Sequence, residues 1–217
     1  MKTLLVIFKD LRLEREQTEA LRKDMNARTQ NRYDLLHNHE ADGKVVYRYP
    51  RIQFRSFQGY AALFGINEGT ELIRGLLESR ELGEPYTGNY QVVSHTDESV
   101  EVGEKFFTYS VREVVPFNAE NYRTYRKLES LTERSAFMEN KMAIHLVQFC
   151  REFGVPFEKG DIRLRLKSMQ KVPEPELKGE RVLAFDLVME TNLSFPDYLS
   201  FGRMKSLGWG TVKRIRS

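Results

Sequence analysis

The apolar run Leu4-Leu5-Val6-Ile7-Phe8 lies near the start of the sequence, and the order of elements that follows it decides the expected fold. Its β-branched and aromatic residues are typical of a buried strand. After this run, Leu13, Leu21 and Met25 recur at roughly helical spacing, and Asp10 is placed to cap that helix. We therefore expect a strand followed by a helix.

The rest of the first half alternates strands with one more helix. Between residues 70 and 79, apolar residues recur as they do on one face of an amphipathic helix. The expected strands lie at 44–57, with an interruption at Pro50, and at 60–66, 88–93 and 99–102. Strand, helix, strand, strand, helix and strand is the order of a ferredoxin-like unit, which RNA-recognition modules also use.

A second unit of the same kind is expected from Phe106 onward. Its expected elements are a strand at 106–115, helices at 118–127 and 133–153, strands at 162–169 and 181–189, and a glycine-rich tail. No Gly/Ser-rich linker separates the halves, so we expect a short packed connection near Gly103. The predicted fold class is α+β, with two tandem ferredoxin-like (RRM-like) domains with antiparallel sheets, at residues 1–103 and 104–217.

Composition narrows the class of protein. Hydrophobic residues make up 41% of the 217 residues, which is ample for packed cores. The net charge of +3 is too small to indicate a nucleic-acid partner by itself, so the evidence for such a partner has to come from where the charges lie in the sequence. Cys150 is the single cysteine, which excludes an internal disulfide and a cysteine-rich zinc site and fits the cytoplasm. The first apolar run is too short to span a membrane, so we expect no membrane association.

The tail concentrates glycine and positive charge. Residues 201–216 contain no acidic residue, and they include the spacing Gly202, five residues, then Gly208-Trp209-Gly210. Glycine lets a ligand approach the backbone closely, and exposed amides with flanking cations attract phosphate oxygens. The tail therefore predicts a nucleic-acid ligand. A tight turn with solubilising lysines is the structural alternative, and in it Trp209 would anchor the loop instead of stacking on a base.

The same spacing resembles the glycine-rich loop of the CRISPR-associated repeat endoribonucleases of the RAMP superfamily. Phe201, Gly202 and 208–210 match that pattern, whereas Ser200 stands where its first glycine is expected. The segment 38–55 is also similar to the first half of one branch of that family. The resemblance implies two ferredoxin-like halves, a histidine with tyrosine or lysine helpers in the first half, and CRISPR repeat RNA as the partner. Other CRISPR effector subunits and a second copy of the chain are further candidate partners.

The candidate catalytic groups lie in a histidine-containing segment of the first half. Cleaving RNA without a metal requires a base for the ribose 2′-hydroxyl, an acid for the departing oxygen and a cation for the charge on phosphorus. We assign His39 as general base, His37 as general acid or second base, and Lys44 and Tyr47 as stabilisers. A solvated His-x-His turn is the alternative. We expect no metal or other cofactor, because two histidines supply only part of a coordination shell.

Two segments alternate apolar with polar or basic residues. In a strand at 162–167, every second side chain points to the same face, so Arg163, Arg165 and Lys167 would form one exposed basic row. The segment 51–55 repeats this pattern with Arg51, Gln53 and Arg55. A solvated strand face explains either row taken singly, whereas two rows and the tail together favour one RNA-binding surface. The predicted RNA-binding residues are Arg51, Arg55, Arg163, Arg165, Lys167, Gly202, Arg203, Lys205, Gly208, Trp209, Gly210 and Lys213.

The sequence therefore predicts a metal-independent endoribonuclease that cuts CRISPR repeat transcripts into guide RNAs by internal attack of the 2′-hydroxyl. Two alternatives remain: a non-catalytic RNA-binding subunit of a guide-RNA complex, and a ferredoxin-like module that binds a small molecule or a protein. His145 shares a helical stripe with Met138, Met142 and Phe149, which favours a structural role for this histidine.

Overall fold

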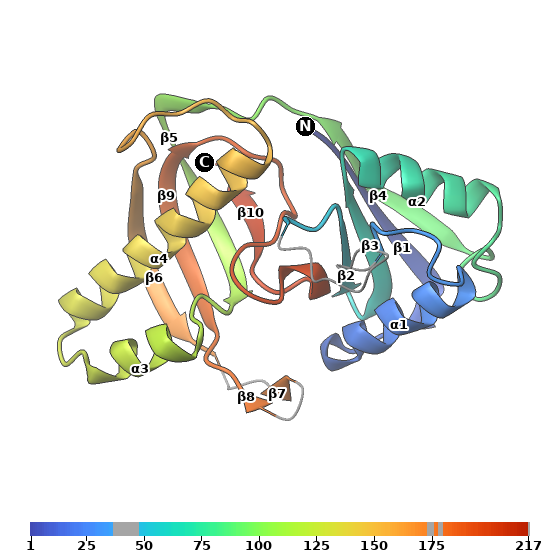
Figure 1. Ribbon diagram of the computed structural model, residues 1–217, viewed down its shortest axis with the longest axis horizontal. Coiled ribbons are helices and arrows are strands. Elements are labelled where there is room, and N and C mark those ends of the chain that lie inside the picture. The colour runs from blue at the N-terminus through green and yellow to red at the C-terminus, as the bar shows by residue number, and fades with distance from the viewer. Residues whose placement is uncertain (37–47, 173–175, 178–179, 217) are drawn as a thin grey trace. The chain divides into compact units, whose positions relative to one another are not determined.

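Two four-stranded antiparallel sheets form the framework of the chain (Figure 1). The structure is a computed structural model and describes residues 1–36, 48–172, 176–177 and 180–216. The chain divides into two compact units, the first made of Met1–Glu98 with Ser206–Gly208 and the second of Ser99–Lys205 with Trp209–Ser217. Each unit combines one of the sheets with helices, so the fold is α+β.

The first unit has the ferredoxin-like topology. Its elements are β1 (Lys2–Arg12), η1 (Arg15–Gln17), α1 (Thr18–Arg28), β2 (Ile52–Phe57), β3 (Tyr60–Ile66), α2 (Glu68–Glu78) and β4 (Tyr90–Asp97). The strand order is β2-β3-β1-β4, and all neighbours are antiparallel. Each helix crosses between two strands that are separated by a third, as a split βαβ unit requires.

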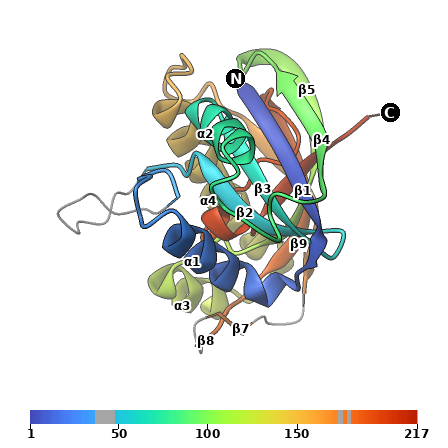
Figure 2. The same ribbon diagram turned by 90° about the vertical axis from the view of Figure 1, so that its right-hand side faces the viewer.

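Both helices of the first unit cover the same face of its sheet (Figure 2). Alternate side chains of a strand share a face, so Val6 and Phe8 meet Met25 of α1 and Ile73 and Leu76 of α2 in one core. These side chains are almost completely buried. Burying a side chain of this size contributes about 1.5–3 kcal/mol, and this apolar face therefore holds the helices on the sheet.

The start of α1 differs from the prediction. The strand β1 continues to Arg12, because it pairs with β3 as far as Arg12 opposite Tyr60. Asp10 therefore caps no helix, and its carboxylate accepts a hydrogen bond from the backbone N–H of Asn89 at 3.1 Å. Glu14 and Gln17 form a capping box at η1, and α1 begins only at Thr18. Strand pairing with a distant segment thus overrode the local capping signal.

The second unit repeats the strand order of the first with different connections. Its elements are β5 (Val102–Val114), α3 (Ala119–Lys127), α4 (Leu131–Glu152), β6 (Leu164–Lys171), β7 (Glu176–Leu177), β8 (Glu180–Arg181), β9 (Phe185–Leu193) and β10 (Thr211–Ile215). The sheet order β10-β5-β9-β6 again places the first and third strands in the centre. Between β9 and β10, where a ferredoxin-like unit has its second helix, lie the glycine-rich segment and the short η2 (Lys205–Leu207).

The helices of the second unit begin at strong caps. Asn118 accepts a hydrogen bond from the N–H of Asn121, and Ser130 forms a capping box with Glu133. Such caps contribute about 1 kcal/mol each. Along α4, Met138, Met142, Leu146 and Phe149 form a fully buried stripe. Of the helices in the described part of the chain, none is long and apolar enough to cross a membrane.

Candidate functional site

The glycine-rich tail forms a tight, buried turn. Gly202 and Gly210 have φ angles of +83° and +71°, which are strained for residues with a side chain. A Cβ on Gly202 would lie 2.8 Å from the carbonyl oxygen of Val115, so no larger residue fits without movement. Ser200, in contrast, forms a β-bridge with Thr211, where the backbone is strand-like. The serine at the position of the expected glycine is therefore accommodated.

Trp209 packs inside the protein. Its side chain is only 1% exposed, so it cannot stack on a nucleotide base without leaving its site. Nearby in the chain, the buried ring of Phe201 contacts Phe149 and Phe195, with ring centroids 5.4 and 5.3 Å apart. This arrangement supports the structural alternative for Trp209, in which the indole anchors the loop.

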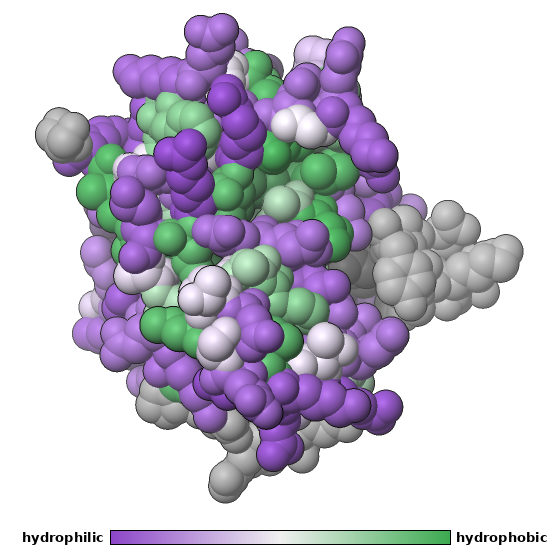
Figure 3. Space-filling model, turned by 90° about the vertical axis from the view of Figure 1, so that its left-hand side faces the viewer, coloured by the Kyte–Doolittle hydropathy of each residue, from purple (hydrophilic) through white to green (hydrophobic). Residues whose placement is uncertain are grey.

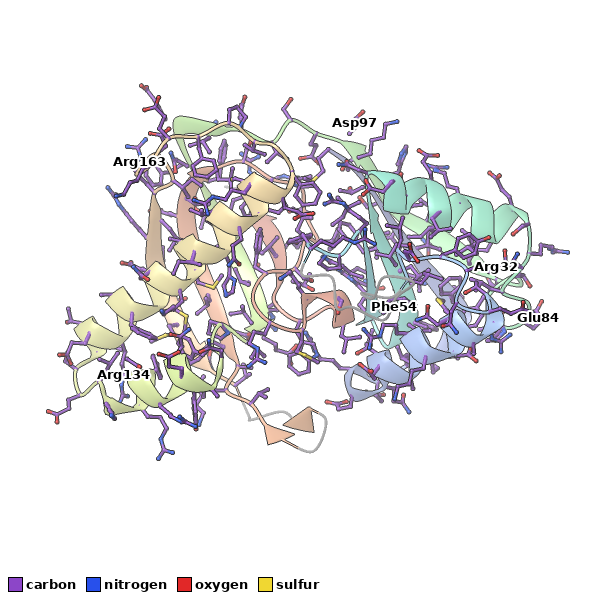
Figure 4. The ribbon with its side chains drawn as sticks, in the orientation of Figure 1. Arg32, Phe54, Glu84, Asp97, Arg134 and Arg163 are labelled. Atoms are coloured by element: carbon purple, nitrogen blue, oxygen red, sulfur yellow. The ribbon has the colours of Figure 1, made fainter. Side chains whose placement is uncertain are left out.

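The residues Ser206–Gly208 belong to the first unit, where they lie against β2. A Cβ on Gly208 would lie 2.6 Å from Cβ of Arg55 and 3.0 Å from the carbonyl oxygen of Phe54. The Gly208 carbonyl accepts a hydrogen bond from Nη2 of Arg15 at 3.1 Å. Figure 4 labels Phe54 on β2. The absence of a side chain at Gly208 thus allows direct contact of its backbone with the strand.

The row expected at Arg51, Gln53 and Arg55 is not an exposed face, which corrects the prediction. The side chains of Gln53 and Arg55 are 0% and 3% exposed. Nη2 of Arg55 donates to Oε1 of Gln53 at 2.5 Å, and its guanidinium lies 4.7 Å from the ring centroid of Phe64. Arg51 forms an ion pair with Glu68 at 2.6 Å. The face of the sheet that carries Gln53 and Arg55 also carries buried apolar residues. The alternation of residue types along β2 therefore did not reveal that this face is buried.

The row at Arg163, Arg165 and Lys167 is exposed, as predicted. The guanidinium groups of Arg163 and Arg165 each lie 5.2 Å from the ring centroid of Phe106. Lys167 forms an ion pair with Glu190 at 3.3 Å. Arg163 is labelled in Figure 4, and Figure 3 shows the side of the second unit that carries β6, where hydrophilic side chains surround smaller apolar areas. The contacts with Phe106 hold two positive charges at defined positions on the surface.

The cations of the tail lie in different environments. Arg203 and Lys213 are exposed, and Nη1 of Arg203 donates to the carbonyl of Phe117 at 3.4 Å. Lys205 is largely withdrawn from solvent, and this desolvation lowers the pKa of its ammonium group, while Glu152 opposes the shift. Arg203 and Lys213 are therefore better placed than Lys205 to contact a phosphate.

His145 has the structural surroundings that its helical stripe predicted. Its Nε2 lies 3.2 Å from the carbonyl oxygen of Pro116. Burial lowers the pKa of His145, and the positive charges of Lys205 and Lys141 lower it further, whereas the hydrogen bond to Pro116 opposes the shift. The ring is therefore neutral near pH 7 and holds α4 against the segment that precedes α3.

The candidate catalytic residues, His37, His39, Lys44 and Tyr47, lie outside the residues that the structure describes. The residues that flank them belong to the first unit. Nη2 of Arg48 donates a hydrogen bond to the carbonyl of Asp34 at 3.3 Å, and Leu36 and Tyr49 are buried. Among the residues that the structure describes, no cluster of three His, Cys, Asp or Glu side chains could hold a metal ion.

A cavity in the second unit was not anticipated from the sequence. It has a volume of about 550 Å³, and the described residues that line it are Tyr122, Tyr125, Arg126, Arg134, Lys171, Leu183 and Phe185. Tyr122, Tyr125 and Arg126 have the i, i+3, i+4 spacing that places side chains on one face of a helix. This spacing was the only available signal, since the other lining residues come from distant segments.

Comparisons with known proteins agree with the family that the tail and the first half indicated. Residues 1–96 match the model of the Cas6b N-terminal domain, and residues 101–215 match that of the Cas6b C-terminal domain. No curated protein matches the sequence.

Solved structures show the same fold. A crystal structure of Cas6b has a TM-score of 0.80 at 20% identity and covers 99% of both chains. A CRISPR RNA processing endoribonuclease Cas6b has a TM-score of 0.72 at 19% identity, with 99% of this chain and 100% of that chain covered. Csf5, a type IV Cas6 crRNA endonuclease, has a TM-score of 0.65 at 10% identity over 99% of both chains. Because the two domain models together span nearly the whole sequence, the chain belongs to the Cas6b family.

Proposed function

We propose that this Cas6b protein is an endoribonuclease that cleaves CRISPR repeat transcripts into guide RNAs, and that it does so without a metal ion. The match of both halves to the Cas6b domains is the observation that carries this proposal. The fold shared with a CRISPR RNA processing endoribonuclease supports it. The exposed basic residues of β6 supply the positive surface that an RNA backbone requires.

The proposed chemistry is internal attack by the ribose 2′-hydroxyl on the adjacent phosphate. His39 accepts the proton of this hydroxyl, and His37 donates a proton to the departing 5′-oxygen or acts as a second base. Lys44 and Tyr47 stabilise the negative charge that builds on the phosphorane by charge and by hydrogen bonding. The products are a 2′,3′-cyclic phosphate and a 5′-hydroxyl. One such acid or base contributes roughly 100-fold to 10,000-fold in rate.

Exposed cations among the predicted residues hold the RNA. Arg163, Arg165, Lys167, Arg203 and Lys213 are exposed and can contact phosphates directly. The buried glycines and Trp209 shape the loop, and this places the neighbouring cations. We also propose that the protein is cytoplasmic, and that it binds other CRISPR effector subunits or a second copy of the chain.

The test is cleavage of the protein's repeat RNA in the presence of a chelator, with the ends of both fragments mapped. His39→Ala should slow cleavage roughly 100-fold or more. His95→Ala is the matched control, because His95 is an exposed histidine of the same unit on β4. Cleavage that requires an added divalent metal, or that leaves a 3′-hydroxyl, would defeat the mechanism. Unchanged cleavage by a His37→Ala/His39→Ala double variant would show that neither histidine takes part in the reaction.

A further inference from the structure

The cavity of the second unit has the size of a binding site for a small organic ligand. It lies among α3, α4 and the ends of β6 and β9, and Arg134, which lines it, is labelled in Figure 4 near the start of α4. Its volume of about 550 Å³ falls in the range of roughly 300–1,000 Å³ that is typical of sites for small organic ligands. The catalytic proposal makes no use of it.

The described residues that line the cavity include three cations. Arg126, Arg134 and Lys171 line it, and the described lining residues include no carboxylate. Burial raises the pKa of the Tyr125 hydroxyl, and the nearby positive charges of Arg134 and Lys171 oppose this shift. Nε of Arg134 donates to the carbonyl of Leu128 at 3.0 Å, which orients its guanidinium group. Arg126 and Arg134, which converge on this cavity, favour an anionic ligand.

The cavity also presents aromatic rings. Tyr125 is held by Phe117 and Phe185, with ring centroids 4.8 and 5.7 Å away. Tyr122 is half-buried one helical turn before Tyr125 and Arg126. Planar rings beside cations form the combination that binds single-stranded nucleic acid, because the rings stack on bases and the cations contact phosphates. The chemistry of the lining therefore matches a nucleotide better than a simple anion.

We propose that this cavity binds one unpaired nucleotide of the RNA, with its base against Tyr122 and its phosphate held by Arg126 and Arg134. This inference rests on the proposed function, because it takes the RNA substrate as the ligand. An unpaired nucleotide is required because a base within an A-form duplex is stacked and its ring face is inaccessible.

The first test compares two arginines on α3. Arg126 and Arg123 are both exposed and lie three residues apart, but only Arg126 lines the cavity. Binding is measured with 2′-O-methyl repeat RNA, which lacks the attacking hydroxyl and remains intact. Arg126→Gln should weaken binding at least about 5-fold and lower the slope of log affinity against log salt by about 0.7. Arg123→Gln should change neither quantity measurably. Equal effects of the two variants would overturn the proposal.

The second test concerns the base. Tyr122→Leu removes the aromatic ring and should weaken binding about 5-fold or more, whereas Tyr122→Phe keeps the ring and should bind like the unaltered protein. A series of RNAs is prepared in which each RNA has one abasic nucleotide at a different position. At one of these positions, loss of the base should weaken binding to the unaltered protein but not to the Tyr122→Leu variant. A series without such a position contradicts the proposal. Binding of adenosine monophosphate as tight as that of the repeat RNA would instead indicate a site for free nucleotides and would also overturn it.

The outcomes separate this inference from the proposed function. In cleavage assays, Arg126→Gln should raise KM more than it lowers kcat, because Arg126 is proposed to bind RNA and is not one of the proposed catalytic residues. If the protein cleaves repeat RNA but Arg126→Gln and Arg123→Gln behave alike, only the cavity proposal fails. If the protein cleaves no RNA but the Arg126 and Tyr122 variants lose affinity as described, the catalytic proposal fails and the cavity proposal stands.

Discussion

A Cβ atom on Gly210 would lie 2.0 Å from the carbonyl oxygen of Phe201. The two residues are also joined by a hydrogen bond of 2.9 Å from the N–H of Phe201 to the carbonyl of Gly210. This contact closes the glycine-rich turn between β9 and β10. The glycine is therefore required for the fold of the loop, in addition to any role of the loop in RNA binding.

Gly210→Ala should destabilise the protein by at least about 2 kcal/mol, because alanine meets both a backbone clash and an unfavourable positive φ. The measurement is the free energy of unfolding from urea denaturation. Gly75→Ala is the control, since nothing lies within 4 Å of its added Cβ in α2. It should be neutral or stabilise the protein by up to about 1 kcal/mol. A loss of stability in Gly75→Ala as large as that in Gly210→Ala would contradict this account.

Met142→Ala should cost about 2–5 kcal/mol of unfolding free energy, because it removes a fully buried side chain from the stripe of α4 that packs in the core. Leu131→Ala is the matched control at the start of the same helix, where the leucine side chain is 73% exposed. Its effect should stay within about 0.5 kcal/mol. Thermal or urea unfolding of the two variants separates the effect of burial from that of helix propensity, because alanine has a high helix propensity at both positions.

The stability of the protein should fall as the pH drops below 6.5, the ordinary pKa of histidine. His145 is the residue that we expect to cause this fall. Burial lowers the pKa of this ring in the folded state, so the unfolded chain binds a proton that the folded chain resists. Above pH 6.5 both states are neutral at this position and the contribution vanishes. His145→Gln should therefore flatten the decline in unfolding free energy on the acid side.

The control for the pH experiment is His95→Gln, which replaces an exposed ring on β4. Its curve of unfolding free energy against pH should follow that of the unaltered protein. If His145→Gln shows the same acid-side decline as the unaltered protein, His145 is not the group responsible.

Arg163→Gln and Arg165→Gln should each weaken binding of repeat RNA broadly across RNA sequences, because contacts with phosphates do not read bases. Each variant should lower the slope of log affinity against log salt by about 0.7–0.9. Arg151→Gln, an exposed arginine in the last turn of α4, serves as the control and should leave the slope unchanged. A change of affinity without a change of slope would show that these arginines do not contact phosphates.

Local patterns in the sequence predicted most of the elements. The expected strand at 60–66 is β3, and the expected helices at 70–79 and 118–127 correspond to α2 and α3 within two residues at either end. These segments have a strong period or a clear cap, and both signals act between residues close in the chain. The glycine spacing of the tail likewise indicated the family that the domain comparison confirmed.

The exposure of side chains was not predictable from the same patterns. Arg55 alternates with apolar neighbours as Arg165 does, yet Arg55 is 3% exposed and Arg165 is exposed. The difference depends on what covers each face of the sheet, including Gly208, which comes from a segment about 150 residues further along the chain.

By itself, the sequence indicated most of the strands and helices, the two ferredoxin-like halves and the family, because these depend on local periodicity and on a short motif. Only the tertiary structure decided that Trp209 is buried and that Tyr122, Arg134 and Lys171 line one cavity. Burial and convergence depend on contacts between residues far apart in the chain, and local spacing carries no information about such contacts.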